Sequence, residues 1–190
     1  MTALNPLEPL HDPVTAVQQL IDRFDQKGII IGGIAASLLG QPRLTADANA
    51  LILLSLDEIP QLLQVAQENG IVPRISDVIS FARQSRVLLL KHKASGINID
   101  ISLGLLPFEV EAVERSQVYK TGTLCLRLPT PEDLIILKAV AHRPKDMLDI
   151  TAVIAAQPEL DKERIEFWVQ QFADLLEMPE MWADLQKLLS

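Results

Sequence analysis

Two oxygen-bearing side chains stand two positions apart at the start of an apolar segment, in the order Asp47, Ala48, Asn49, Ala50. Residues two apart on a β-strand point to the same face of a sheet. We therefore expect Asp47 and Asn49 to project side by side, with the two alanines packed behind them. Oxygens on one face suit a hard divalent cation such as Mg²⁺, which usually takes one or two carboxylates together with phosphate oxygens and water. The pattern predicts a cation site that includes Asp47 and Asn49.

A pair of glycines, Gly32 and Gly33, follows the apolar residues 29–31. Because glycine lacks a Cβ, the backbone there can approach a phosphate closely, and a helix starting there would present free N–H groups and the positive end of its dipole. Ser37 lies in this expected helix and could reach the same phosphate. Two plainer interpretations stay open, because such a glycine pair is often only a turn and Ser37 also suits an ordinary helical position.

A second carboxylate lies on an alternating segment, residues 97–103, in which every other residue is Ile or Leu. The alternation predicts a half-buried strand with Asp100 on its polar face. Residues 86–92 read as its antiparallel partner, and residues 93–96 as the turn of the hairpin. Asp100 by itself could also be an ordinary solvated residue.

The order of these features resembles the pattern of minimal nucleotidyltransferases, in which a glycine pair is followed by Asp-x-Asp and then by a third aspartate on a neighbouring strand. The resemblance continues in a helix after a proline-rich turn that carries Lys138, in an Arg-Pro-Lys-Asp segment ending at Asp146, and in Asp149-Ile150. This succession is similar to AbiEii-type and related toxin-like members of the family. It spans residues 28–150.

The resemblance implies Mg²⁺ or Mn²⁺ held by Asp47, Asn49 and Asp100, a nucleoside triphosphate as substrate, and transfer of its nucleoside monophosphate to an acceptor hydroxyl. Asp47 and Asp100 would be the catalytic residues. Gly32, Gly33 and Ser37 would contact the nucleotide. The family likeness also implies a role as the toxin of a toxin–antitoxin pair, with an antitoxin or another protein as partner.

Arg43, in the loop before the first aspartate, and Lys138 are candidates for neutralising charge on the triphosphate. Lys138 has a second interpretation, a structural ion pair with Asp146 or Asp149. Both interpretations are kept at this point.

Asn49 departs from the family pattern, which has a second aspartate at this position. An amide oxygen can coordinate a cation but brings no charge, so an arrangement of two divalent ions loses one of the negative groups that hold it together. Two hypotheses therefore remain. The chain is either an active nucleotidyltransferase, or a catalytically degenerate relative that binds a nucleotide or a protein partner.

Composition limits the other classes of function. The chain has 190 residues, of which 48% are hydrophobic and 22% charged, and its net charge is −8. This acidic balance disfavours broad nucleic-acid binding, which depends on neutralising phosphates. Cys125 is the single cysteine, so no disulfide framework is expected, and the expected location is the cytoplasm without membrane insertion.

Helix-like segments alternate with the strands and then dominate the end of the chain. Helices are expected at residues 12–27, 57–69 and 76–84 and then at residues 131–141, 145–156, 161–176 and 179–189. A further strand is expected at residues 124–128. The predicted fold class is α+β, a small mixed nucleotidyltransferase-like sheet with helices on one face. Residues 1–128 would form its α/β core, and residues 129–190 a helical C-terminal part packed on that core in a single compact unit.

Overall fold

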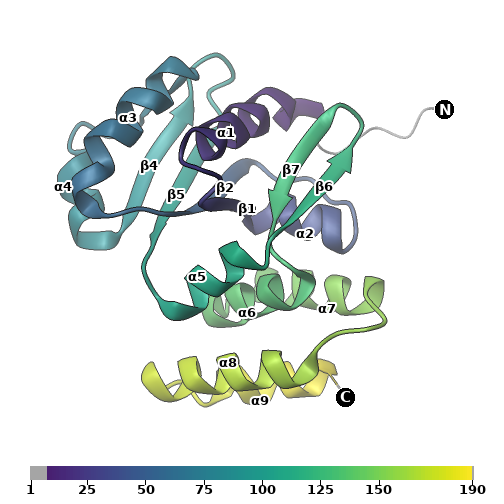
Figure 1. Cartoon of the computed structure of the whole chain (residues 1–190). Helices are drawn as coiled ribbons and strands as arrows, with labels where there is room; N and C mark the ends of the chain where they lie inside the picture. Colours follow the sequence, from purple (N-terminus) through teal and green to yellow (C-terminus); the bar gives the residue numbers. More distant parts are fainter. Residues whose placement is uncertain (1–7, 190) are drawn as a thin grey trace.

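The computed structural model describes residues 8–189, which contain a mixed sheet of five strands (Figure 1). The strands lie in the order β1-β2-β5-β4-β3, and only β2 and β5 run parallel to each other. Their bounds are β1 Gly28–Ile31, β2 Asp47–Leu53, β3 Ile71–Pro73, β4 Val87–His92 and β5 Asn98–Gly104. The parallel pair at the centre brings the beginnings of β2 and β5 to the same edge of the sheet.

One face of this sheet is largely apolar, because Ala48, Ala50 and Ile52 of β2 and the isoleucines of β5 are buried there. Helix α1 (His11–Arg23) packs on this face, where a Cβ at Gly28 would meet both Ile52 and Ile21 of the helix. Helix α3 (Ile59–Glu68) follows a short 3₁₀ turn, Leu56–Glu58, and packs beside α1. Helix α4 (Val78–Ser85) contacts β4.

The opposite face is only partly covered. Helix α2 (Gly32–Leu39) begins beside Asn49 of β2, and helix α5 (Pro107–Glu114) lies against the other end of β2 and Gly104. The expectation of helices on one face alone was therefore wrong. The polar side chains of β2 and β5 lie on this partly covered face.

A separate hairpin of β6 (Gln117–Thr121) and β7 (Leu124–Leu128) packs against β1 and α1. The sequence predicted β7 but not its partner, because the residues of β6 are mostly exposed and give no apolar alternation. Cys125 of β7 is exposed. It points away from the buried Leu124, Leu126 and Leu128, as the strand period of two requires.

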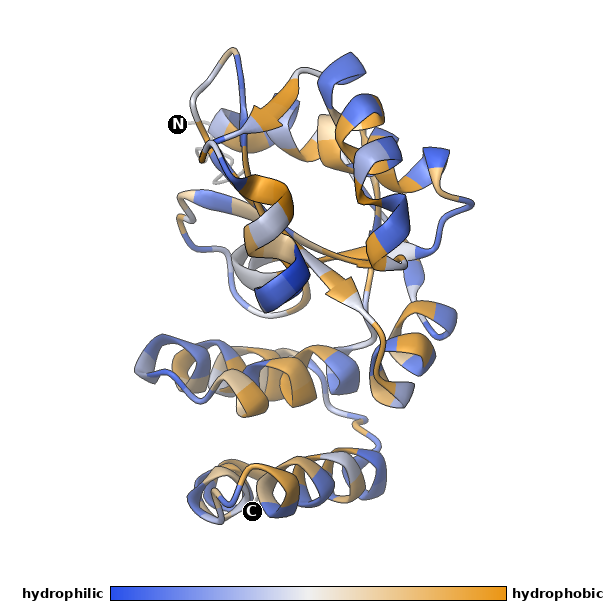
Figure 2. Ribbon diagram, turned by 90° about the vertical axis from the view of Figure 1, so that its left-hand side faces the viewer, coloured by the Kyte–Doolittle hydropathy of each residue, from blue (hydrophilic) through white to orange (hydrophobic). Residues whose placement is uncertain are grey.

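Four helices complete the chain: α6 Pro131–Ala141, α7 Pro144–Ala156, α8 Lys162–Leu175 and α9 Glu180–Leu189. Side chains cap two of them, since Thr130 Oγ1 accepts a bond from the Asp133 N–H and Asp161 Oδ1 accepts one from the Arg164 N–H. Figures 1 and 2 show α6 and α7 between the strands and the outer pair α8 and α9. Phe108 of α5 packs on Trp168 and Phe172 of α8.

The α+β fold class, a small mixed sheet flanked by helices with a helical C-terminal extension, is confirmed. The later helices begin and end within one or two residues of their predicted bounds. Helix α1 begins at His11, one residue before its predicted start, and ends at Arg23, four residues before its predicted end. The division at residues 128 and 129 stays a prediction. Within residues 8–189, no helix is both long enough and apolar enough to cross a membrane.

Candidate active site

The pairing register of the two parallel strands brings the predicted polar side chains together. Asn49 lies opposite Asp100, and Asp47 lies opposite Asn98. Paired residues of neighbouring strands project to the same face, so Asp47, Asn49 and Asp100 share one face of the sheet. They line a cavity of about 500 Å³. The two carboxylates lie near enough for the charge of Asp47 to raise the pKa of Asp100.

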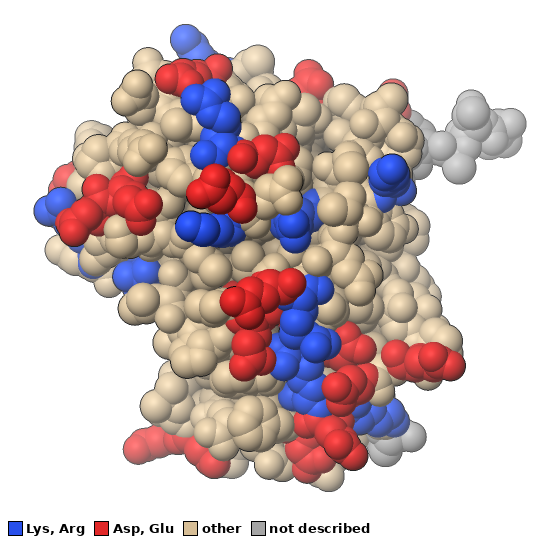
Figure 3. Space-filling view, in the orientation of Figure 1, with Lys and Arg blue, Asp and Glu red and all other residues tan. Residues whose placement is uncertain are grey.

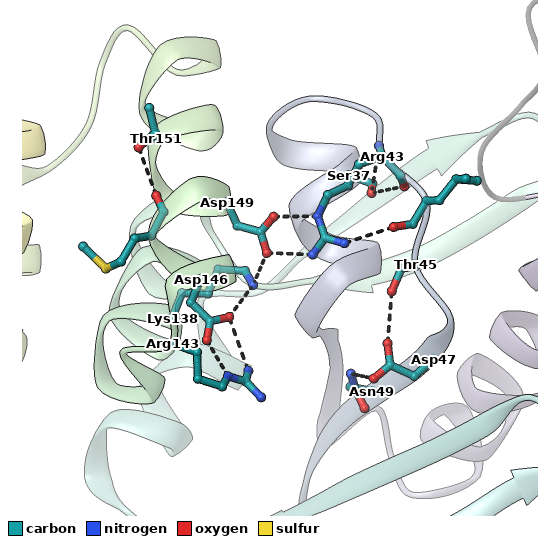
Figure 4. A network of polar contacts seen from close by, with 12 residues as sticks. Ser37, Arg43, Thr45, Asp47, Asn49, Lys138, Arg143, Asp146, Asp149 and Thr151 are labelled. Atoms are coloured by element: carbon teal, nitrogen blue, oxygen red, sulfur yellow. Dashed lines mark hydrogen bonds and ion pairs between the residues drawn. The ribbon is translucent and has the colours of Figure 1, made fainter.

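Neutral donors hold the carboxylate of Asp47. Thr45 Oγ1 donates to Asp47 Oδ1 at 3.0 Å, and Asn49 Nδ2 donates to Asp47 Oδ2 at 3.3 Å (Figure 4). Neither partner carries a charge. The negative charge of Asp47 therefore stays available to a cation in the cavity.

Asp100 has a charged partner that the sequence did not indicate. Arg74 Nη2 donates to Asp100 Oδ1 at 2.7 Å, and the two side chains are 25% and 36% exposed. The pKa of Asp100 is nevertheless raised above its ordinary value, because burial and the charge of Asp47 together outweigh the opposing effect of Arg74. A carboxylate with a raised pKa is a better proton acceptor than an ordinary surface aspartate.

The glycine pair forms the entrance to α2 and lines the same cavity. Gly32 has φ of +71°, and a Cβ there would lie 2.7 Å from Asn49 Nδ2. A Cβ at Gly33 would overlap the Oγ1 atom of Thr45. Absence of side chains is thus required for the loop to approach β2 this closely. Among residues 8–189 no side chain caps this helix, so its first N–H groups can bind another acceptor.

Basic residues line the other side of the cavity and come from two parts of the chain that are far apart in the sequence. Arg43 precedes β2, Lys138 lies on α6, and Arg143 and Lys145 lie at the start of α7. Figure 4 shows that the first three converge on two aspartates of α7, Asp146 and Asp149. Only Lys145 has no ion pair among those found in residues 8–189.

Asp149 accepts bonds from two cations. Arg43 Nε donates to Asp149 Oδ1 at 2.6 Å, Arg43 Nη2 donates to Oδ2 at 2.8 Å, and Lys138 Nζ donates to Oδ2 at 2.6 Å. Burial alone would raise the pKa of Asp149, but the hydrogen bonds and charges of Arg43 and Lys138 outweigh it and lower that pKa. The pKa of Asp146 is lowered for the same reason, by Arg143 and Lys138.

Lys138 itself is 5% exposed and donates to both aspartates, to Asp146 at 3.2 Å and to Asp149 at 2.6 Å. The ion-pair interpretation of Lys138 therefore describes its contacts in this structure. The side chain of Lys138 also lines the cavity. Lys138 could therefore contact a phosphate only while it remains paired with the two aspartates.

Ser37 is the one predicted site residue that does not line the cavity. Its hydroxyl donates to the Arg43 carbonyl oxygen at 3.0 Å and is buried. Ser37 thus fixes the loop that carries Arg43. This contact is with the protein backbone, whereas the sequence had suggested a phosphate.

Comparison with known proteins agrees with this geometry. The family described as "Nucleotidyltransferase of unknown function (DUF6036)" matches residues 8–181. The chain belongs to this family. No match was found among curated protein sequences.

Solved structures of low sequence identity share the fold of this DUF6036 protein. The antibiotic-resistance factor ANT(2″)-Ia has 15% identity and a TM-score of 0.57, over 90% of this chain and 96% of that one. An antigenic nucleotidyltransferase-like protein from Paracoccidioides brasiliensis has 15% identity and a TM-score of 0.56, over 94% and 93%. ANT(2″)-Ia in complex with adenylyl-2″-tobramycin has 14% identity and a TM-score of 0.56, over 86% and 98%.

The nucleotidyltransferase fold implies a divalent cation, and the donor set of the cavity can be tested against it. Within the described part of the chain, no three His, Cys, Asp or Glu side chains group in a way that could hold a metal ion. Two carboxylates and one amide, from Asp47, Asp100 and Asn49, share the cavity face. This set fits one hard cation that also takes phosphate and water oxygens.

Thr45 and Arg74 are the site residues that sequence reasoning missed. Thr45 stands two positions before Asp47, so the strand period that linked Asp47 to Asn49 could have included it. Arg74 has no such local signal, because it follows β3 at the far side of the sheet and reaches Asp100 across β4.

Proposed function

We propose that the protein binds a nucleoside triphosphate with one Mg²⁺ or Mn²⁺ in this cavity and transfers the nucleoside monophosphate to an acceptor hydroxyl. One observation carries the proposal: Asp47 and Asp100 share a sheet face in a cavity whose other wall is basic. A site that offers oxygen ligands on one side and cations on the other suits a metal-bound polyphosphate.

Each group has a task in this proposal. Asp47 and Asp100 would hold the cation, with the amide oxygen of Asn49 in the place of a second aspartate. When bound, the cation would neutralise charge on the phosphate oxygens. The free N–H groups at the start of α2 and the side chains of Arg43 and Lys145 would bind the phosphates from the other side.

The reaction would be an in-line displacement at the α-phosphorus. The acceptor oxygen forms a bond to this phosphorus, the bond to the oxygen that bridges the α- and β-phosphates breaks, and pyrophosphate leaves. The hydroxyl proton passes to the carboxylate of Asp100, which lies on the same face of the cavity as Asp47. Because the proposed substrate is a nucleoside triphosphate, we propose that the protein acts in the cytoplasm.

A second candidate function is nucleotide binding without transfer, or binding of a protein partner. Two observations favour it: residue 49 supplies an uncharged amide, and Asp100 is already paired with Arg74. Both lower the negative charge available to metal ions. The two candidates differ in whether pyrophosphate is released.

Incubation of the protein with each of four labelled nucleoside triphosphates and MgCl₂ or MnCl₂ tests the first candidate. Pyrophosphate release by the wild type, and its loss by about 100-fold or more in Asp47→Asn, would support transfer. The matched control is Asn98→Ala, which alters the neighbouring residue of the same cavity without removing a carboxylate. Binding without release in the wild type, together with release in Asn49→Asp, would instead favour the degenerate relative.

The acceptor is tested in the same assay with RNA, a protein mixture and small polyhydroxylated molecules, including aminoglycosides. The AbiEii-type resemblance leads us to propose a toxin that is countered by an antitoxin. Induced expression would then arrest growth of the host, and Asp47→Asn would relieve the arrest. Growth that is equal with wild type and variant would contradict the toxin role.

A further inference from the structure

Arg74 lies beside the candidate metal site, just past the end of β3. Its backbone N–H donates to the Leu89 carbonyl oxygen at 3.0 Å, which extends the pairing of β3 with β4 by one residue. Leu89 in turn lies opposite Asp100 in the pairing of β4 with β5. The side chain of Arg74 therefore crosses one strand to reach Asp100, where Nη2 and Oδ1 are 2.7 Å apart. The place of its backbone follows from this hydrogen bond to β4.

The side chains that surround the candidate metal site on the sheet differ in charge. Asp47 and Asp100 contribute two negative charges, Asn49 contributes none, and Arg74 contributes one positive charge. Within residues 8–189 the side chain of Arg74 has no other ion pair. Asp100 thus has a permanent cationic partner, while both partners of Asp47 are neutral.

A guanidinium beside a carboxylate repels any further cation that would approach the same oxygens. It also supplies the neutralisation that a metal ion would otherwise give to that carboxylate. Both effects act at Asp100 through direct contact with Arg74. Asp47 has no ion pair among residues 8–189 and interacts with the charges of Arg43 and Arg143 only over a longer range. One divalent cation can still bind, with Asp47 as its main charged ligand.

We propose that Arg74 takes the electrostatic place of a second divalent cation, so that the site binds a single metal ion. Arg74 and Asn49 then form a matched pair: one supplies a fixed positive charge, and the other omits the negative charge that a second ion would require. The inference rests on the proposed metal-dependent function. It assigns Arg74 a role as a positioning residue that determines how many metal ions are bound.

Titration of the full-length protein with Mn²⁺ in the absence of nucleotide tests this. Electron paramagnetic resonance of free Mn²⁺ gives the number of bound ions and their dissociation constants. The wild type should bind one ion. Arg74→Met keeps much of the side-chain volume but removes the charge, and it should bind that ion about tenfold more tightly or better. Arg74→Lys should stay close to the wild type, because it keeps the charge.

The decisive comparison is between a variant at Asn49 alone and a variant at both Asn49 and Arg74. Asn49→Asp alone should bind one ion, whereas Asn49→Asp with Arg74→Met should bind two. Arg83→Met is the matched control, since Arg83 is an exposed arginine on α4, and it should leave stoichiometry and affinity unchanged. Circular dichroism and thermal unfolding of each variant confirm that the fold is retained.

The inference is overturned if the wild type binds two ions, if Arg74→Met leaves the affinity unchanged, or if the double variant still binds one ion. Its failure differs from failure of the proposed function. Failure of the inference is seen in the Mn²⁺ stoichiometry without nucleotide. Failure of the proposed function is seen in the absence of pyrophosphate release with every nucleoside triphosphate. A protein that releases pyrophosphate with two bound ions would contradict only the inference.

Discussion

Arg43 and Asp149 lie 106 residues apart in the sequence and form a two-point ion pair, with Nε–Oδ1 at 2.6 Å and Nη2–Oδ2 at 2.8 Å. This pair ties the loop that leads into β2 to helix α7 of the C-terminal part. Because Asp47 begins β2, the same pair fixes the approach to the candidate metal ligand. The helical part therefore contributes to the position of the site as well as to its wall.

Loss of the Asp149 carboxylate should destabilise the fold strongly. In Asp149→Ala the buried ammonium of Lys138 would keep only Asp146 as partner. We expect the free energy of unfolding to fall by about 3 kcal/mol, as measured by urea denaturation. Arg43→Ala should cost less, because Asp149 would still be paired with Lys138 and the side chain of Arg43 is 38% exposed.

Asp174→Ala serves as the control for this series, because Asp174 is an exposed aspartate on α8. Its effect should stay within about 0.5 kcal/mol. A loss for Asp149→Ala that is no greater than for Asp174→Ala would show that the network contributes nothing to stability.

Acid should weaken the fold through Asp146 and Asp149. Their pKa values are lowered from the ordinary 3.8, so near that pH the folded state binds fewer protons than the unfolded state. The stabilisation is fully present above about pH 5 and is lost as the pH falls through the lowered values. Urea denaturation between pH 3 and pH 6 should show this loss. Asp149→Asn should show a shallower dependence on pH, and an equal slope would count against the network as its source.

The contribution of Asp100 to stability should change with pH in the opposite direction to that of Asp146 and Asp149. Its pKa is raised above 3.8, so the folded state binds more protons there and stability declines as the pH rises through the raised value. Asp100→Asn should therefore remove this decline while it also abolishes transfer. A variant that loses activity without any change in the pH dependence of unfolding would contradict the raised pKa.

Gly32 of the glycine pair can be compared with Gly96, because the two residues have the same φ angle. Gly32 and Gly96 both have φ of +71°, but a Cβ at Gly32 would meet Asn49 whereas at Gly96 nothing lies within 4 Å. Gly96→Ala should cost about 1–2 kcal/mol from its backbone alone. Gly32→Ala should cost more and should also weaken nucleotide binding. Equal losses of stability in the two variants would argue against the close approach at Asn49.

Asn49→Asp should make the metal-free protein less stable and its stability more sensitive to metal. A third carboxylate beside Asp47 and Asp100 adds repulsion on the order of 1 kcal/mol at this partly exposed position. Thermal unfolding should show a lower midpoint without divalent ions and a larger gain on adding MgCl₂ than in the wild type. KCl at matched ionic strength is the control. An equal gain with both salts would mean that general screening explains the effect.

Local sequence pattern was sufficient to predict much of the fold and of the candidate site. The period of two in residues 97–103 placed Asp100 on a polar face, and the spacing of Asp47 and Asn49 placed both on one side of a strand. Helices α6 and α7 were marked by proline at their starts and by apolar positions along them. Each of these signals arises within a few residues, where backbone geometry alone relates sequence to structure.

Only the tertiary structure decided which charged side chains from distant segments form ion pairs. Arg74 reaches Asp100 because β3 pairs with β4 and β4 with β5, and Arg43 reaches Asp149 because α7 packs against α2. A charged residue has no local feature that selects its partner, since any nearby opposite charge would satisfy it. The sequence by itself thus determined the two strands that carry Asp47, Asn49 and Asp100, the face on which these side chains lie, and the glycine bend. Chain packing decided which charges meet, because that depends on distances between segments far apart in the sequence.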